Sequence, residues 1–213
     1  MFMNTFVIAI FTCIISTIFV LSVAYSMSRM RFKMRKPFMN IAMIIGLFPS
    51  FMSMIAVYYI LRALNLADGA MIRVALIIVF SAGSGAGFYV AKGFFDTISK
   101  SLDEAAIIDG ATRWNVFTKI TVPLSKPIIV YTILTSFMGP WVDFIFGKVI
   151  CRADAQYYTV SIGLWKMLEK EYIDSWYTCF AAGAVVVSIP IAILFLMTQK
   201  FYVEGITGGA VKG

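Results

Sequence analysis

The sequence contains no histidine and few charged residues. Lys, Arg, Asp and Glu make up 14% of its 213 residues, whereas a soluble domain carries about 25%. Histidine is the commonest general base and metal-ligating side chain, so its absence excludes Ser-His-Asp and Cys-His catalytic arrangements. The sequence also has no zinc-type or haem-type cysteine spacing and no glycine-rich loop ending in Lys-Ser or Lys-Thr. We therefore predict no catalytic residue, no metal site and no cofactor bound by this chain.

Cysteine is scarce as well. Cys13 lies inside an apolar run and is typical of a small core residue. Cys151 and Cys179 are both expected near the outer face of a membrane, so a disulfide between them is conceivable. We predict three free thiols.

Apolar residues dominate what remains. They make up 61% of the chain, and the mean hydropathy is +0.88. Five apolar runs are long enough for membrane-spanning helices, which need about 20 residues each. The predicted fold is therefore all-α, a polytopic transmembrane helical bundle forming one domain over 1–213. The predicted spans are 6–27, 38–61 (kinked at Pro49), 72–91, 128–150 (interrupted at Gly139-Pro140) and 177–198.

The net charge of +7 does not indicate a nucleic-acid partner. The basic residues flank apolar runs, where lipid headgroups and membrane orientation account for them. Most of them fall in segments 29–36, 92–127 and 199–213. The positive-inside rule therefore predicts that these segments are cytoplasmic, in a multi-pass protein of the cell membrane.

Small residues gather at 81–87 in the third predicted span. A dinucleotide-binding fingerprint is excluded there, because no strand precedes the glycines. Gly83 and Gly87 have the four-residue spacing that lets two membrane helices approach closely. We predict that they pack against another helix of this chain or of a partner subunit.

The stretch 101–111 reads as a capped helix at the membrane surface. Ser101 and Glu104 have the spacing of a capping box. Gly110 is placed to end the helix in the left-handed conformation. Thr112 can cap a second short helix reaching Lys119, and Pro123 and Pro127 are expected to stop it. The capping pattern alone therefore predicts a compact helix-turn-helix that a partner protein could bind.

The same stretch resembles the EAA loop of binding-protein-dependent ATP-driven importer permeases. In that family the loop forms the coupling helix that docks in a cleft of the cytoplasmic ATP-hydrolysing subunit. The resemblance implies a cytoplasmic coupling loop over 92–127. The alternative is a capped interfacial helix with no partner. The coupling residues that the resemblance implies are Glu104, Ala105, Ala106, Asp109, Gly110, Ala111 and Pro123.

Two further segments resemble sugar importers of this family. Residues 157–164 resemble its Tyr-Thr-Leu-Ala-Val-Gly stretch, and 199–213 resembles the cytoplasmic tail that projects into the ATPase dimer in relatives of the maltose transporter. The resemblance implies a carbohydrate permease of the type I importer fold, like the second permease of maltodextrin systems. The implied partners are a cytoplasmic ATP-binding subunit dimer, a second permease, an extracytoplasmic solute-binding protein, a sugar and membrane lipid. ATP is expected on the partner subunit.

The family usually has six spans with a cytoplasmic N-terminus, and 1–5 resembles the entry to its second span. The first helix is therefore expected to be missing, which a fragment, a misassigned start or a natural short form would each explain; we favour a truncated or mis-started chain.

Asp143 is the one ionisable residue expected at membrane depth. Residues 141–144 resemble the family's Trp-Asn-acidic-Phe segment, although Val142 replaces the Asn. Asp143 is a candidate pathway residue if it faces a cavity or a partner. Equally, it could lie in water near the outer helix end or pair with Lys148.

Two rival functions would require polar or ionisable groups inside the membrane. An ion-coupled carrier or channel would line several helices with ionisable or polar residues. An intramembrane enzyme would need a nucleophile and base, or paired carboxylates, at membrane depth. Asp143 is a single carboxylate, so it provides neither the several polar helix faces of a carrier or channel nor the residue pair of an enzyme.

Overall fold

The computed structural model describes residues 1–47, 50–83, 87–152, 154–169 and 173–210. These residues form helices joined by turns, with no strand in the described ranges, which confirms the all-α class. Pro49, at which a kink was predicted, lies outside them.

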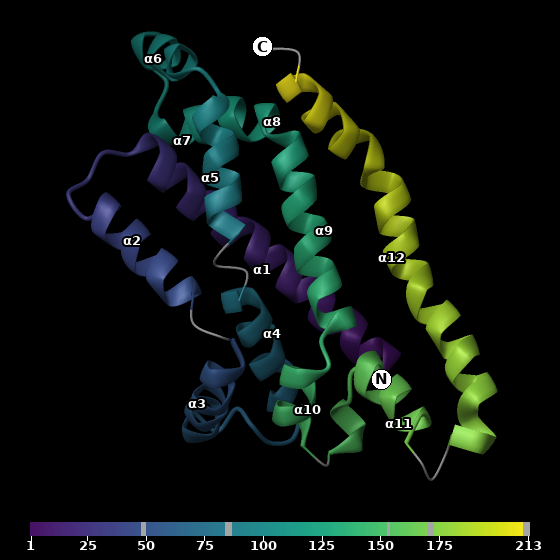
Figure 1. Cartoon of the computed structure of the whole chain (residues 1–213). Coiled ribbons are helices and arrows are strands. Elements are labelled where there is room, and N and C mark those ends of the chain that lie inside the picture. The colour runs from purple at the N-terminus through teal and green to yellow at the C-terminus, as the bar shows by residue number, and fades with distance from the viewer. Residues whose placement is uncertain (48–49, 84–86, 153, 170–172, 211–213) are drawn as a thin grey trace.

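Helix α1 (Phe2–Arg29) runs the length of the bundle (Figure 1). It packs against α4 (Met71–Gly83), α5 (Gly87–Thr97) and α9 (Lys126–Val142). Small buried residues recur along it at helical spacing, namely Thr5, Ala9, Thr12, Ser16 and Ala24. Small side chains let membrane helices pack closely, so the sequence of α1 suits a central position.

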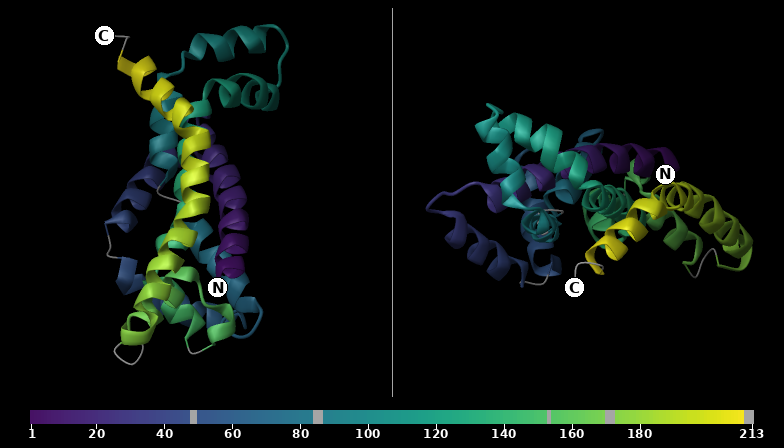
Figure 2. Two further views of the ribbon diagram at one scale, coloured as in Figure 1. Left: turned by 90° about the vertical axis from the view of Figure 1, so that its right-hand side faces the viewer. Right: turned by 90° about the horizontal axis from the view of Figure 1, so that it is seen from above.

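Helix α12 (Ile173–Ala210) is the second long apolar helix. It lies along one side of the bundle, against α9 and α11 (Val160–Met167) (Figures 1 and 2). Pro190 lies inside it, and such a proline is tolerated because neighbouring groups in a membrane bundle can satisfy the freed carbonyl. α1 and α12 correspond to the first and last predicted spans.

The other three predicted spans are broken. Run 38–61 forms α2 (Arg35–Gly46) and α3 (Ser50–Ala63), and run 72–91 forms α4 and α5, which meet at 44°. By length and composition two described helices, α1 and α12, can cross a membrane alone. The number rises to four if each of two bent pairs is one span, namely Met71–Gly83 with Gly87–Thr97 and Arg113–Leu124 with Lys126–Val142. The count of five spans is therefore not confirmed.

The predicted interruption at Gly139-Pro140 is wrong. α9 continues to Val142, and the amide of Asp143 still donates to the Gly139 carbonyl at 3.1 Å. Proline removes one amide donor, and α9 tolerates that loss. The break comes at Asp143 and Phe144, before α10 (Ile145–Cys151).

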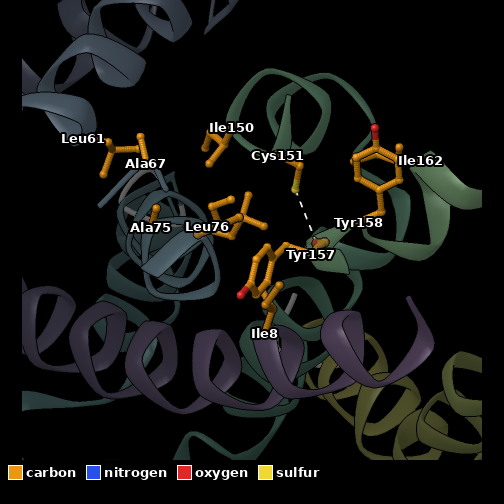
Figure 3. Close-up of a cluster of buried hydrophobic side chains, with 11 residues drawn as sticks. Ile8, Leu61, Ala67, Ala75, Leu76, Ile150, Cys151, Tyr157, Tyr158 and Ile162 are labelled. Atoms are coloured by element: carbon orange, nitrogen blue, oxygen red, sulfur yellow. Dashed lines mark hydrogen bonds between the residues drawn. The ribbon is translucent and has the colours of Figure 1, made fainter. Parts of the chain in front are cut away.

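Buried side chains near the N-terminal end of α1 hold α1, α3, α4, α10 and α11 together (Figure 3). The cluster includes Ile8, Leu61, Leu76, Ile150 and Ile162. The buried Cys151 thiol donates to the Tyr157 carbonyl at 3.4 Å. Cys13, Cys151 and Cys179 are all free, as predicted.

The helix ends gather in two groups (Figure 1). The C-terminal ends of α1 and α5 lie at the same end of the molecule as α6 (Lys100–Ile108), α7 (Arg113–Val116) and α8 (Val122–Leu124), and α12 reaches this end with its last turns. The start of α1, α10 and α11 lie at the opposite end. Loop 92–127 and the end of α12 therefore share one end of the bundle.

Candidate functional site

Helix α6 projects beyond the bundle at the end reached by loop 92–127 (Figure 2). Glu104, Ala105 and Asp109 are exposed, and Ala106 is half-buried. Within the described part of the chain, the Glu104 carboxylate has neither a hydrogen bond nor an ion pair. Of the other predicted coupling residues, Gly110 and Pro123 are exposed and Ala111 is half-buried.

The predicted capping box at Ser101 is wrong. α6 begins at Lys100, and its N-cap is Ser99, whose hydroxyl oxygen accepts from the Ser101 amide at 3.3 Å. Ser101 already lies in the first turn, and its hydroxyl bonds that of Ser99 at 2.7 Å. Glu104 therefore does not cap α6.

The carboxyl end of α6 agrees with its prediction. Gly110 has φ +86, a conformation that glycine adopts without a Cβ penalty. Its amide donates to the Ile107 carbonyl at 3.0 Å, and the Ala111 amide donates to the Ala106 carbonyl at 2.9 Å. This is the Schellman pattern, which satisfies two terminal carbonyls and reverses the chain.

The second helix of the loop starts as predicted and ends later. The Thr112 hydroxyl oxygen accepts from the Asn115 amide at 3.2 Å, so Thr112 is the N-cap. The helix does not stop near Lys119 but continues through π-helix η2 (Phe117–Thr121) into α8, with Pro123 inside it.

The π turn explains why Pro123 is tolerated. The Val122 amide donates to the Phe117 carbonyl, and this wider turn relieves the clash that a proline makes with the carbonyl four residues earlier. The chain then bends by 81° between α8 and α9. Pro127 lies in the first turn of α9, where proline is favoured.

Several large apolar side chains of the loop are exposed. Ile108 is 85% exposed and Trp114 is 69% exposed. Five large apolar side chains of the loop are exposed, and large exposed apolar patches on a protein mark interaction sites. We call this set the loop patch: Leu102, Ile107, Ile108, Trp114 and Leu124.

Arg29 attaches the loop to α1. Its Nη2 donates to the carbonyls of Phe95 at 3.0 Å and Ile98 at 2.8 Å. Its Nε lies 3.2 Å from Oδ2 of Asp103, and the two side chains are only 4% and 13% exposed. The sequence places Arg29 in a basic cluster, and its position at the end of a span is the only signal of this role.

Two neighbours of Arg29 add further contacts between α1 and the loop. The Ser28 hydroxyl donates to Oδ1 of Asp96 at 2.6 Å. The Tyr25 hydroxyl donates to the Arg113 carbonyl at 3.4 Å, and the Tyr25 ring lies 4.7 Å from that of Phe117. The last turns of α1 therefore contact α5, α6, α7 and η2.

A cavity of about 900 Å³ lies between α1, α3, α4 and α9. Its lining includes the hydroxyl-bearing residues Thr12, Thr132, Thr135 and Ser136, and Asp143. Asp143 therefore faces a cavity, which was one of its two predicted positions.

The predicted pairing of Asp143 with Lys148 is wrong. Oδ1 of Asp143 accepts from the Gly147 amide at 2.9 Å and so caps the start of α10. The Lys148 ammonium lies 5.9 Å from the centroid of the Tyr158 ring. The half-buried carboxylate thus combines a structural contact with a place in the cavity wall.

Gly83 and Gly87 lie on either side of the α4–α5 break, and both line the cavity. A Cβ on Gly83 would meet no atom of the described residues within 4 Å, and one on Gly87 would touch Val20 at 3.8 Å. Their packing against a partner subunit remains a prediction.

The chain is similar to known transport proteins over most of its length. The family model described as binding-protein-dependent transport system inner membrane component matches residues 16–204. The galactooligosaccharides transport system permease protein GanQ of Bacillus subtilis is 35% identical over 213 residues, covering 100% of this chain and 74% of GanQ. The maltodextrin transport system permease protein MalD of Streptococcus pneumoniae is 32% identical over 212 residues, covering 100% of this chain and 74% of MalD.

A solved structure shares the fold. It is a chain of the crystal structure of a bacterial ABC transporter involved in the import of the acidic polysaccharide alginate. The TM-score is 0.77 at 26% identity, and the match covers 94% of this chain and 74% of that one.

Proposed function

Because this chain belongs to the family of binding-protein-dependent transport system inner membrane components, we propose that it is the permease subunit of an ATP-driven sugar or oligosaccharide importer. The chain is a transport subunit and not an enzyme, and ATP hydrolysis belongs to a partner ATPase. The relatives named for galactooligosaccharides and maltodextrin support the sugar assignment.

The main support for the coupling role is that helix α6 is exposed and capped at both ends. It presents Glu104, Ala105 and Asp109 to the outside, and the Schellman turn at Gly110 and Ala111 fixes its direction. The loop patch, which includes Leu102, Ile107 and Ile108 of α6 itself, supplies apolar side chains for the ATPase cleft. The proposed coupling residues are Glu104, Ala105, Ala106, Asp109, Gly110, Ala111 and Pro123.

The proposed mechanism is alternating access by rigid-body movement. Closing of the two ATP-binding subunits moves α6, and the helices attached to it rotate to open the cavity to the other side. Hydrolysis returns the bundle to its first state. A second permease and an extracytoplasmic solute-binding protein complete the assembly, and the tail 199–213 reaches the ATPase.

The cavity is the proposed route of the substrate. Hydroxyl groups and a carboxylate can hydrogen-bond a sugar, and the lining residues Thr132, Ser136 and Asp143 carry such groups. An ionisable residue at membrane depth is otherwise costly. This supports Asp143 as a pathway residue.

The proposed topology has five passes, with loop 92–127 and the C-terminus in the cytoplasm. Three of these passes are the broken helix pairs α2–α3, α4–α5 and α9–α10. The shared position of the loop and the last turns of α12 at one end of the bundle supports this orientation (Figure 1).

The test is co-purification of the cognate ATPase from membranes with the chain or with Gly110→Trp. The matched control is Gly69→Trp, because Gly69 also has positive φ, at +57, but lies in the turn between α3 and α4. We expect the native chain and Gly69→Trp to retain the ATPase and Gly110→Trp to lose it. Retained binding and transport in Gly110→Trp would show that α6 is not the contact.

A further inference from the structure

Three helix ends meet around the Arg29 guanidinium. Arg29 lies in the last turn of α1, its Nη2 binds carbonyls at the carboxyl end of α5, and Asp103 lies in the first turn of α6. Cations are stabilised at helix carboxyl ends and carboxylates at helix amino ends. The helix dipoles therefore favour the same arrangement as the ion pair.

The contact is buried on both sides. Arg29 and Asp103 are 4% and 13% exposed, and removing one partner of a buried pair leaves the other charge uncompensated. The planar guanidinium also binds α5 and α6 at the same time, which a lysine ammonium would do less well. Movement of α6 away from α1 would break this contact, so the two helices should move together.

The nearby acid Asp96 belongs to a separate contact. Oδ2 of Asp96 pairs with Lys92 one helical turn earlier, and Oδ1 accepts from the Ser28 hydroxyl. Asp103 is therefore the carboxylate that compensates Arg29.

Helix α1 continues from this junction to the cavity. Thr12 and Val20 of α1 line the cavity, and α1 packs against α4, α5 and α9, which form other parts of its wall. A displacement of α6 that is passed to α1 would therefore reach the cavity wall through one continuous helix.

We propose that Arg29 is a positioning residue that transmits movement of α6 to α1 and so couples the ATPase contact to the cavity. The inference rests on the proposed function, because it takes α6 as the ATPase contact. It adds the residue by which that contact acts on the membrane helices.

The experiment reconstitutes the whole transporter in phospholipid vesicles with its solute-binding protein. Radiolabelled maltotriose or galactobiose serves as the probe. The readout is sugar transported per ATP hydrolysed, together with the amount of ATPase that co-purifies. The variants are Arg29→Gln and Asp103→Asn, and the matched control is Arg31→Gln, which removes the same charge at an exposed position two residues later.

We expect Arg29→Gln to keep its ATPase and to hydrolyse ATP, because the loop patch is unchanged. The sugar transported per ATP should fall about three- to thirtyfold, the range typical of coupling networks. Arg31→Gln should match the native ratio. The double variant of Arg29→Gln and Asp103→Asn should be no worse than Arg29→Gln alone, because both remove one contact.

If Arg29→Gln transports as much sugar per ATP hydrolysed as the native chain, the inference is wrong and the proposed function still stands. If Arg29→Gln fails to assemble, Asp103→Asn is the deciding variant, because it removes the charge and keeps the side-chain size. A native amount of sugar transported per ATP in Asp103→Asn also overturns the inference. If the native complex neither binds an ATPase nor transports sugar, the proposed function fails and the inference falls with it.

Discussion

Asp143 caps a helix and also carries a negative charge into the cavity, and two substitutions separate these roles. Asn keeps an oxygen that can accept from the Gly147 amide, whereas Ala removes the cap at a cost of about 1 kcal/mol. We therefore expect Asp143→Asn to keep native stability and lose transport. Asp143→Ala should lose transport and also melt about 2–4 °C lower. Thermal unfolding of the purified protein and vesicle transport are the measurements.

Asp154→Asn is the matched control for Asp143. Oδ1 of Asp154 likewise accepts from a backbone amide, that of Gln156 at 3.3 Å, and Asp154 does not line the large cavity. Asp154→Asn should keep both the native melting temperature and the native rate of vesicle transport. Native transport in Asp143→Asn would show that Asp143 only caps α10 and that its charge has no role in transport.

At the scale of the element, the loop patch should bind without contributing to the fold. Ile108 is 85% exposed, so Ile108→Asp should change the free energy of unfolding by less than about 0.5 kcal/mol. Burying an isoleucine in an interface contributes about 1.5–3 kcal/mol. We therefore expect the affinity for the ATPase to fall about ten- to a hundredfold. Titration of the solubilised permease with purified ATPase measures it.

The control for the loop patch is Ile108→Met, which keeps an apolar side chain of similar volume. It should bind the ATPase like the native chain. If Ile108→Asp and Ile108→Met bind the ATPase with equal affinity, Ile108 of the loop patch does not contact the ATPase.

The two ends of α6 show which features a sequence can predict. Its carboxyl end depends on one glycine and on bonds within six residues, so Gly110 could be identified directly. Its amino end has two candidate caps, Ser99 and Ser101, and the direction of the chain leaving α5 decides between them. Arg29 helps to set that direction through the Ile98 carbonyl, and no local pattern pairs Arg29 with this segment.

At the scale of the whole molecule, hydropathy predicted an all-helical membrane bundle but not where its helices break. The break after Val142 is stabilised by the Asp143 carboxylate on Gly147 and by the Ser161 hydroxyl on the Asp143 carbonyl. Ser161 belongs to α11, a separate element. Contacts of this kind decide that the predicted run 128–150 is two helices, and its composition does not reveal them.

At the scale of the whole molecule, cysteine labelling tests which end of the bundle lies in the cytoplasm. Asp68 in the α3–α4 turn and Ile108 on α6 are both exposed. The α3–α4 turn and α6 lie at opposite ends of the bundle (Figure 1). The excess of Lys and Arg in 29–36 and 92–127 predicts that the α6 end is cytoplasmic. In a Cys179→Ser background, Asp68→Cys should react with a membrane-impermeant maleimide in intact cells. Ile108→Cys should react only in opened membranes from which the ATPase has been stripped. The reverse pattern would place α6 outside the cell, where no ATPase could reach it, and the coupling proposal would fail with the orientation.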